Sequence, residues 1–299
     1  MMEKSLIAGF DHAMIAVRDL DEASRKYRGL GFEVVPGGRH PGRGTHNTLM
    51  RFGWGFVELI AIHDPEERER LGAEGEGLTN FLKLREGGWV DVILETHATD
   101  QLAERLKAAG VEVGTPFPLG RVRPDGLVTK NRILPTGPIS TRHLYPGIIE
   151  WEQPDPERLA PERQIAHANG ATEVVAVAII VDDLNAARRA YAEVLGLPVD
   201  DEQFVAELGA RRVRCMAGSL TIDLLAATGP GVVESALTAI GEGLFEVRLR
   251  VKDLAHARAM LAEREAVLQP APGAPGGWLL PEESTVGARF VLVEQWKMK

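Results

Sequence analysis

The sequence contains a single cysteine, Cys215, among its 299 residues. A lone cysteine excludes an internal disulfide, so the chain fits a reducing compartment. Basic side chains are also outnumbered: 34 Lys and Arg stand against 43 Asp and Glu, for a net charge of −9 and a pI near 5.5. This charge balance argues against nucleic acid and against an anionic membrane as partners.

Long hydrophobic runs and familiar catalytic motifs are missing as well. The longest wholly apolar run, Val174 to Val181, is too short to span a bilayer, and the N-terminus shows no signal peptide. We therefore expect a cytoplasmic protein. A Walker loop, G-x-S-x-G, H-E-x-x-H and Cys-x-x-Cys are all absent, so the sequence gives no support to the chemistries that depend on them.

The composition is that of a folded globular protein. Hydrophobic residues make up 44% of the chain and charged residues 26%, which is far from the composition of a disordered segment. The length suits two ordinary domains or one duplicated assembly.

A unit of one strand, one helix and further strands recurs along the chain. In the first copy an apolar strand, Phe10 to Val17, leads to Asp19, a helix N-cap candidate with Glu22 three residues later. Apolar residues then recur at helical spacing until Gly31, and two strands at 49–52 and 56–62 complete the unit. The order strand, helix, strands predicts a β-α-β-β-β module.

Three further copies follow the first. They begin with strands near Trp89, Thr172 and Leu244, and each strand leads into a helix. We predict an α+β fold in which four βαβββ modules form two paired, curved, mixed β-sheets with helices on the outer faces. The predicted domains are residues 1–153 and 171–299, joined by a linker at Gln153 to Gly170 that is rich in Pro, Glu and Arg.

One segment lies between the first two modules. Pro65 to Glu86 is charged and periodic, and we expect one or two surface helices there. The strands carry apolar residues on both faces, as at Met14 and Ile15, so a single module cannot bury its sheet alone. Paired sheets of this kind curve around a cleft, where a ligand would bind.

The repeat resembles the vicinal-oxygen-chelate superfamily, which includes glyoxalase I, extradiol dioxygenases and bleomycin-resistance proteins. The first 150 residues resemble its glyoxalase-like domain group, whereas the second half is similar only at superfamily level. The resemblance rests on F-D-H-A-M-I-A-V-R-D-L-D at 10–21, P-G-G-R-H-P-G-R-G-T-H-N at 36–47, G-F-V-E-L-I-A-I at 55–62, R-P-D-G at 123–126 and I-I-E-W at 148–151.

This resemblance implies a metal site between two paired modules, with ligands from their first and last strands. Carried over to this chain, the first module supplies His12 and Glu58, and the second supplies Asp91 and Glu150. Asp91 is a departure, because the family commonly uses His, Gln or Glu at that position. One nitrogen and several carboxylates suit one divalent ion, Mn, Ni, Zn, Fe or Mg, without choosing among them.

The residues themselves leave other interpretations open. Glu58 lies mid-strand among apolar neighbours, so a metal, a basic side chain or water must satisfy its carboxylate. His12, taken alone, is more often a hydrogen-bonded core residue than a ligand. Asp91 and Glu150 could equally be solvated carboxylates at strand ends.

Four further residues are candidate substrate contacts at the mouth of the cleft. They are Arg39, His46, Asn47 and Arg123. The alternative for the first three is an ordinary polar loop, and for Arg123 it is the Pro-Asp-Gly turn that follows it.

The second half has lost the metal pattern, because Ala176 stands where His12 would fall, although Asp223 matches Glu58. We predict no metal there. The leading hypothesis is a metal-dependent enzyme, a lyase, isomerase or hydrolase, that acts on a small carbonyl or oxyanion substrate while Glu58 or Glu150 moves a proton. The alternatives are a metal-free small-molecule binding or resistance protein and a duplicated scaffold. The sequence leaves a homodimer open.

Overall fold

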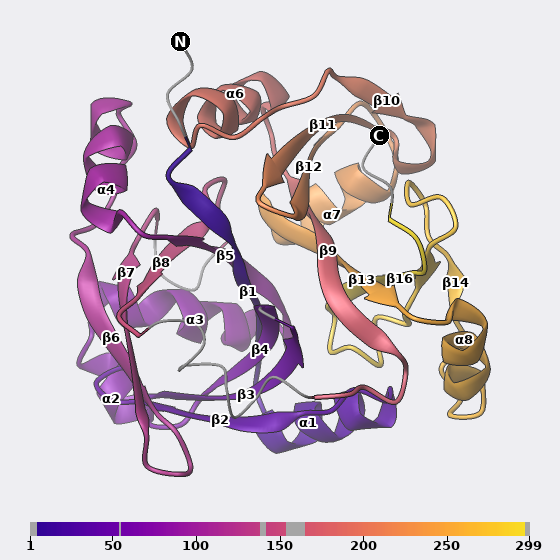
Figure 1. Ribbon diagram of the computed structural model, residues 1–299, viewed down its shortest axis with the longest axis horizontal. Helices are drawn as coiled ribbons and strands as arrows, with labels where there is room; N and C mark the ends of the chain where they lie inside the picture. Colours follow the sequence, from indigo (N-terminus) through magenta and orange to yellow (C-terminus); the bar gives the residue numbers. More distant parts are fainter. Residues whose placement is uncertain (1–4, 54, 138–141, 154–164, 297–299) are drawn as a thin grey trace.

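The computed structural model describes residues 5–53, 55–137, 142–153 and 165–296. Two eight-stranded mixed sheets, one in each half of the chain, form the framework, and most helices lie at the periphery (Figure 1). The predicted α+β fold of repeated βαβββ modules is therefore confirmed. The predicted linker falls largely on residues 154–164, which lie outside the described residues, and the domain boundary stays a prediction.

The first half closes into a barrel instead of remaining a curved open sheet. Its strand order is β1-β4-β3-β2-β6-β7-β8-β5, and the ring closes where β1 pairs antiparallel with β5. The other junction is a single pairing of Arg39 with Val122. The strands are β1 (Ile7–Val17), β2 (Val35–His40), β3 (Thr45–Phe52), β4 (Gly55–Ile62), β5 (Gly87–Thr96), β6 (Phe117–Val122), β7 (Val128–Leu134) and β8 (Gly147–Trp151).

The second half keeps an open sheet with the order β10-β11-β12-β9-β13-β16-β15-β14. Its two edge strands are the shortest of the sheet together with β15, so they offer few backbone groups with which to close a ring. The strands are β9 (Ala171–Ile180), β10 (Gln203–Val205), β11 (Ala210–Ala217), β12 (Leu220–Ala227), β13 (Gly243–Val251), β14 (Gln269–Pro270), β15 (Trp278–Leu279) and β16 (Arg289–Val293).

Each module has its own helix after the first strand, and three of these helices begin at an aspartate cap. The side chains of Asp19, Asp183 and Asp253 accept backbone N–H groups of the first turn. The module helices are α1 (Leu20–Gly29), α4 (Thr99–Ala108), α6 (Leu184–Arg189), which continues as a π-helical turn at Ala190–Val194, and α8 (Leu254–Ala262). Within the described ranges, no helix has the length and apolar character needed to cross a membrane.

The turns that end these helices show how closely the modules repeat. Gly31, Gly110 and Gly196 have φ near +80°, +78° and +70°, a conformation that costs glycine little. The fourth module reaches the same turn with Glu265, at φ +62°. A non-glycine residue there carries backbone strain that its three counterparts avoid.

The segment Pro65 to Glu86 forms α2 (Pro65–Glu69) and α3 (Ala73–Leu84), as predicted, but α3 is more than a surface helix. Leu78 and Leu82 are buried against inward-facing barrel residues such as Met14 and Ile60. In the second half α7 (Val232–Ile240) packs against the sheet in the same way, through Val233. Each half thus uses one inserted helix to cover part of its inner sheet face.

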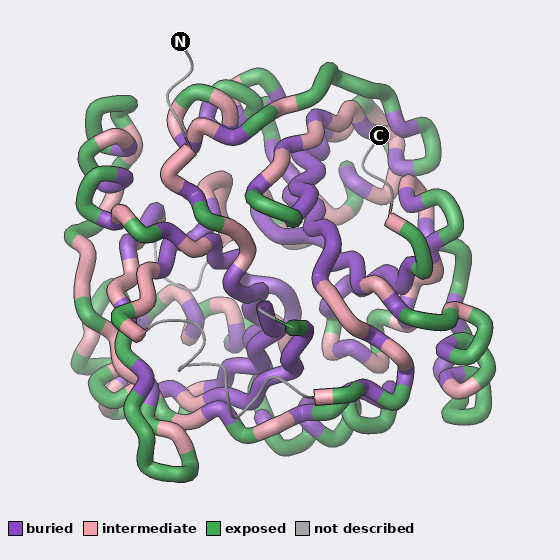
Figure 2. The backbone as a smooth tube through the Cα atoms, in the orientation of Figure 1, coloured by how far each residue is buried: buried purple, intermediate pink, exposed green. Residues whose placement is uncertain are grey.

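A continuous apolar core joins the two halves. One cluster of buried residues includes members from both sheets, and β5 lies against β13 and β1 against β11 where the halves meet. Buried backbone fills the middle of the molecule (Figure 2). Hydrogen bonds cross the same boundary, from Tyr27 Oη to the Thr285 carbonyl at 2.8 Å and from Trp89 Nε1 to the Arg289 carbonyl at 3.2 Å. The halves therefore support each other's packing.

Candidate active site

The barrel of the first half encloses a cavity of about 130 Å³ between its two modules. A cavity of that order accommodates a ligand about the size of benzene. Side chains alternate in direction along each strand, so β4 presents Phe56, Glu58 and Ile60 to the cavity, whereas Val57 and Leu59 join the main core. The predicted ligand-binding cleft is thus a small chamber inside the barrel.

A buried chain of three ionisable side chains lies in the wall of this cavity. His12 Nδ1 is 2.5 Å from Asp11 Oδ1, and His12 Nε2 is 3.4 Å from Glu58 Oε2. Trp151 Nε1 donates to the other oxygen of Asp11 at 2.6 Å, and the Phe56 ring stacks on His12 at 4.5 Å between centroids. The register of β1 against β5 shifts between Phe10 and His12, and such an irregularity re-aims neighbouring side chains.

The two carboxylates fix the charge of His12. Burial of the imidazole would lower its pKa, but hydrogen bonds and charges from Asp11 and Glu58 outweigh burial and raise the pKa to about 9. Burial likewise favours a neutral Glu58, and the hydrogen bond and charge of His12 reverse this, lowering the pKa of Glu58 to about 2. At neutral pH the pair is an imidazolium and a carboxylate.

Asp91 lines the same cavity but has a different environment. Its carboxylate accepts backbone N–H groups from Val92 at 2.7 Å and Gly147 at 3.4 Å, and Oδ2 lies 3.8 Å from His143 Nε2. Burial is the dominant influence and raises the pKa of Asp91 to about 6. The cavity therefore holds two carboxyl groups, Glu58 and Asp91, whose pKa values are driven in opposite directions.

Asn47 and His40 complete the polar wall around Glu58. Asn47 Nδ2 donates to Glu58 Oε1 at 2.6 Å, so this predicted substrate contact does line the cavity. His40, which sequence reasoning missed, lies with Nε2 3.9 Å from Glu58 Oε1 and Nδ1 2.9 Å from Thr45 Oγ1. His40 pairs with Thr45 between β2 and β3, and Thr45 lies on the same face of β3 as Asn47, so all three side chains line the cavity.

Glu150 lies outside the barrel, and the prediction that it joins the other ligands needs correction. Ile149 and Trp151, its neighbours in β8, line the cavity, so alternation directs Glu150 away from it. Its carboxylate is 3.6 Å from Arg132 and 3.4 Å from the backbone N of Thr99. Matching I-I-E-W to F-V-E-L was off by an odd number of residues, and in a strand such an error exchanges the two faces.

The other three predicted substrate contacts also lie outside the cavity, although they lie near one another. Arg39, His46 and Arg123 border a surface depression beside α1. The His46 ring packs at 5.0 Å from that of His63, and Arg123 pairs with Asp125 at 2.9 Å within its turn. The alternative of a polar surface therefore describes them better than contact with a ligand in the barrel.

The predicted four-ligand metal site is not assembled. His12 and Glu58 meet, but Asp91 bonds elsewhere in the cavity and Glu150 is on the opposite face of its strand. Among the described residues, no group of three or more His, Cys, Asp or Glu side chains is arranged to hold a metal ion. The donor set that the resemblance implies thus does not fit the geometry.

Comparison with known proteins agrees with the resemblance in the motifs. A family model described as a glyoxalase-like domain matches residues 10–195, which include the barrel from Phe10 onward and the first strand and helix of the second half. No curated protein matches the sequence.

Solved structures extend the likeness to the second half. A hypothetical protein from Staphylococcus aureus shares 15% identity, with a TM-score of 0.67 over 95% of this chain and 98% of that one. A mutant of 4-hydroxymandelate synthase from Streptomyces coelicolor also shares 15% identity, with a TM-score of 0.63 over 98% and 94% of the two chains. At such identities the likeness establishes the fold alone, and the glyoxalase-like resemblance predicted from the motifs is confirmed by the family model.

Proposed function

Because the chain belongs to the glyoxalase-like domain family, we propose that the barrel cavity is an active site that moves a proton on a small carbonyl or carboxylate compound. One observation carries this proposal: a buried chain of Asp11, His12 and Glu58 borders a cavity inside the barrel, and Asp91 lines the same cavity. Such a site suits those isomerase and lyase reactions that begin with removal of a proton beside a carbonyl.

The walls of the cavity define the substrate class. Apolar side chains such as Met14, Ile60 and Ile93 surround it, and its volume limits the size of the part of the substrate that enters it. Three buried polar atoms that line it have no hydrogen-bond partner among the described residues: Asn47 Oδ1, Asn131 Oδ1 and His143 Nδ1. Buried polar atoms without partners are costly, and a substrate with polar groups would satisfy them.

We assign the roles of Asp91, His12 and Glu58 from their protonation states. Asp91 accepts the proton from the carbon beside the carbonyl, because its pKa of about 6 allows it both to take up and to return a proton near neutral pH. The electron pair left on the substrate becomes an enolate, and the His12 imidazolium supplies positive charge for the enolate oxygen. Glu58 keeps His12 protonated throughout.

The resemblance also implies a divalent metal, Mn, Ni, Zn, Fe or Mg, at His12 and Glu58. Since the expected donors are not brought together, we assign no step to a metal. The direct pairing of His12 with Glu58 also favours a second candidate, a protein that only binds a small molecule in the same cavity. The two candidates differ in whether bound compound exchanges protons.

Deuterium exchange tests the proposal without knowledge of the final product. Pyruvate, methylglyoxal and acetophenone are incubated with the protein in D₂O, and loss of the proton beside the carbonyl is followed by NMR. Asp91→Asn should slow the exchange by about 10²–10⁴-fold, which is the usual contribution of a general base. Glu150→Gln is the matched control and should leave the rate unchanged.

Two other outcomes would replace the proposal. A compound that raises the melting temperature without any exchange would identify the binding protein. Near-stoichiometric metal in the protein purified without chelator, lost in His12→Ala, would restore the metal-dependent enzyme.

A further inference from the structure

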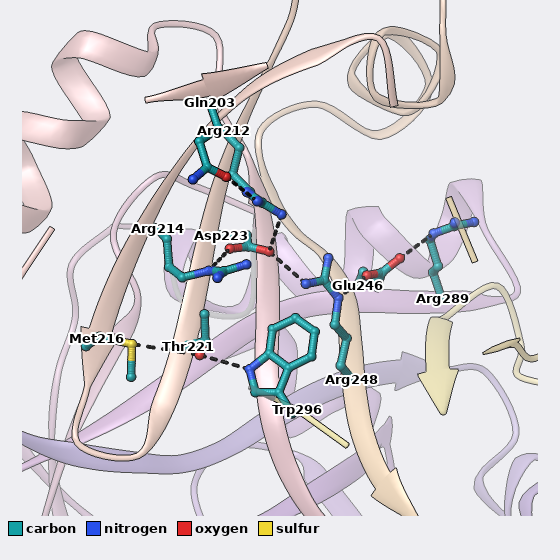
Figure 3. Close-up of polar contacts among 10 residues, drawn as sticks. All are labelled: Gln203, Arg212, Arg214, Met216, Thr221, Asp223, Glu246, Arg248, Arg289 and Trp296. Atoms are coloured by element: carbon teal, nitrogen blue, oxygen red, sulfur yellow. Dashed lines mark hydrogen bonds and ion pairs between the residues drawn. The ribbon is translucent and has the colours of Figure 1, made fainter. Parts of the chain in front are cut away.

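A cluster of arginines lies on the inner face of the open sheet in the second half (Figure 3). Three of them surround the buried Asp223 of β12. Arg248 NH1 and Arg214 Nε donate to its oxygens at 2.7 and 3.0 Å, and Arg212 NH1 lies 3.7 Å away. Arg212 and Arg214 come from β11 and Arg248 from β13, so strands on different sides of Asp223 direct guanidinium groups toward it.

Positive charge exceeds negative charge within this cluster. The second buried carboxylate, Glu246, binds Arg248 at 2.7 Å and Arg289 at 2.9 Å. Four arginines therefore share two buried carboxylates. The third acidic neighbour, Glu282, pairs with Arg289 and is half exposed. The surplus lies at the opposite end of the cluster, at Arg212 and Arg214.

That end of the cluster borders an open pocket of about 420 Å³. Arg212, Arg214, Gln203 and Trp296 line it. Among the described residues Arg214 makes its ion pair with Asp223 alone, through Nε. Arg212 has one terminal nitrogen 2.7 Å from Gln203 Oε1 and the other 3.7 Å from Asp223. The terminal nitrogens of Arg214 are thus left over beside the pocket, in the planar fork that matches an oxyanion.

The pocket also has acidic neighbours, which bear on its preference for a ligand. Asp200 and Asp201 line it, but both are exposed to solvent, where their charges are screened. Burial lowers the pKa of Arg212 and Asp223 opposes this; the Arg214 and Arg248 cations lower the pKa further, and Asp200 has the smallest influence, which raises it. An anion placed beside Arg212 would offset that repulsion.

We propose that the second half binds a small molecule with an oxyanion, a carboxylate or a phosphate monoester, between Arg212 and Arg214 and beside the Trp296 indole. The pocket lies in the second half, where Asp223 occupies the strand position that Glu58 occupies in the first half. The surplus guanidinium groups hold the anion, and Trp296, which rests over Arg248 at 4.9 Å, forms the apolar side of the pocket.

Tryptophan fluorescence and calorimetry test this site at constant ionic strength. The probes are phenyl phosphate, benzoate and inorganic phosphate, with benzyl alcohol as the uncharged control. A saturable change is expected with at least one anion and none with benzyl alcohol. Trp296→Phe should remove the fluorescence change while calorimetry still records binding.

Arginine variants locate the site. Arg212→Gln should weaken binding by about tenfold or more, the scale expected for loss of a charge-assisted contact. Arg211→Gln is the matched control, because Arg211 is the adjacent β11 residue and pairs with Glu202 instead. Arg212→Lys keeps the charge beside Asp223 and should weaken binding by a smaller factor, which gives a second reading if the glutamine variant does not fold.

The outcomes are separable. Tighter binding of phenyl phosphate supports a phosphate ligand, and tighter binding of benzoate supports a carboxylate. Absence of saturable binding with all three anions would overturn the proposal, as would equal affinity in wild type and both Arg212 variants.

Discussion

The two halves place a carboxylate at the same position of their sheets and neutralise it by different means. Glu58 in β4 is 4% exposed, and its cationic partner is His12, which can lose its proton. Asp223 in β12 is fully buried, and its partners are arginines, which cannot be deprotonated in proteins. The charge of the His12 pair therefore depends on pH, whereas the arginines around Asp223 keep their positive charge.

The difference begins with single residues on neighbouring strands. β1 supplies His12 next to Glu58, whereas β9 has Ala176 at the matching position. The cation in the second half comes from Arg248 of β13, where the matching β5 residue is Ile93. Because β5 carries no arginine or lysine at this position, the first half retains a cavity beside Glu58.

The largest effect on stability should follow from removing the permanent cation. Arg248→Met leaves Asp223 and Glu246 buried beside each other with one partner fewer, and it should lower the free energy of unfolding by about 3–5 kcal/mol. Arg250→Met, two residues along β13, breaks a half-exposed pair with Glu173 and should cost about 1 kcal/mol or less. Urea unfolding of both variants measures the contrast, and equal losses would show that Arg248 is not the anchor of the cluster.

In the first half the buried cation is His12, and its contribution to stability should depend on pH. The folded-state pKa of His12 is raised to about 9, so its contribution is complete below the unfolded value of 6.5 and is lost as the pH rises through 9. The loss should amount to about 3 kcal/mol. Unfolding free energies at pH 6.5 and 9.5 measure it, and His12→Gln should show a correspondingly flatter profile over that window. Parallel profiles for wild type and variant would refute the charged pair.

The buried carboxylate of Asp91 should lower the stability of the folded protein at neutral and higher pH. A carboxyl group whose pKa is raised to about 6 destabilises the fold once the pH exceeds its unfolded value, and the cost is complete above the folded one. Asp91→Asn should therefore raise the free energy of unfolding at pH 8 by about 1–3 kcal/mol while slowing proton exchange by about 10²–10⁴-fold. The exposed Asp182→Asn serves as the control. A destabilised Asp91→Asn variant would mean that its backbone hydrogen bonds outweigh burial.

The smallest effect concerns the turn that distinguishes the fourth module. Glu265→Gly should stabilise the protein by about 0.5–1 kcal/mol, because glycine relieves the positive φ that the other modules accommodate with glycine. Gly110→Ala, at the same turn of the second module and with open space around it, should destabilise by a similar amount. Melting temperatures of the two variants that shift in the same direction would contradict this account of the turn.

The sequence predicted the modules and the heart of the site because both depend on local patterns. Alternation placed Glu58 mid-strand, and the repeat placed His12 and Asp91 on facing first strands, where they do line one cavity. Closure of the first sheet into a barrel could not be predicted, since it depends on a single pairing between β2 and β6, far apart in the chain.

The errors at the site have one physical origin. A shift by an odd number of residues exchanges the faces of a strand, and Glu150 fell on the wrong side through such a shift. Arg39 and His46 face outward for a related reason, because their neighbours His40 and Asn47 take the inward positions. Without a known pairing register, sequence spacing alone cannot tell the two faces apart.

Titration of His12 by NMR tests the central claim most directly, because the whole site depends on an imidazolium held between Asp11 and Glu58. The ring protons of His12, assigned with His12→Gln, should titrate with a midpoint near 9 in the wild type, and Glu58→Gln should lower that midpoint. A wild-type midpoint at or below the ordinary value of about 6.5 would contradict the account, because His12 would then be neutral and could not stabilise an enolate.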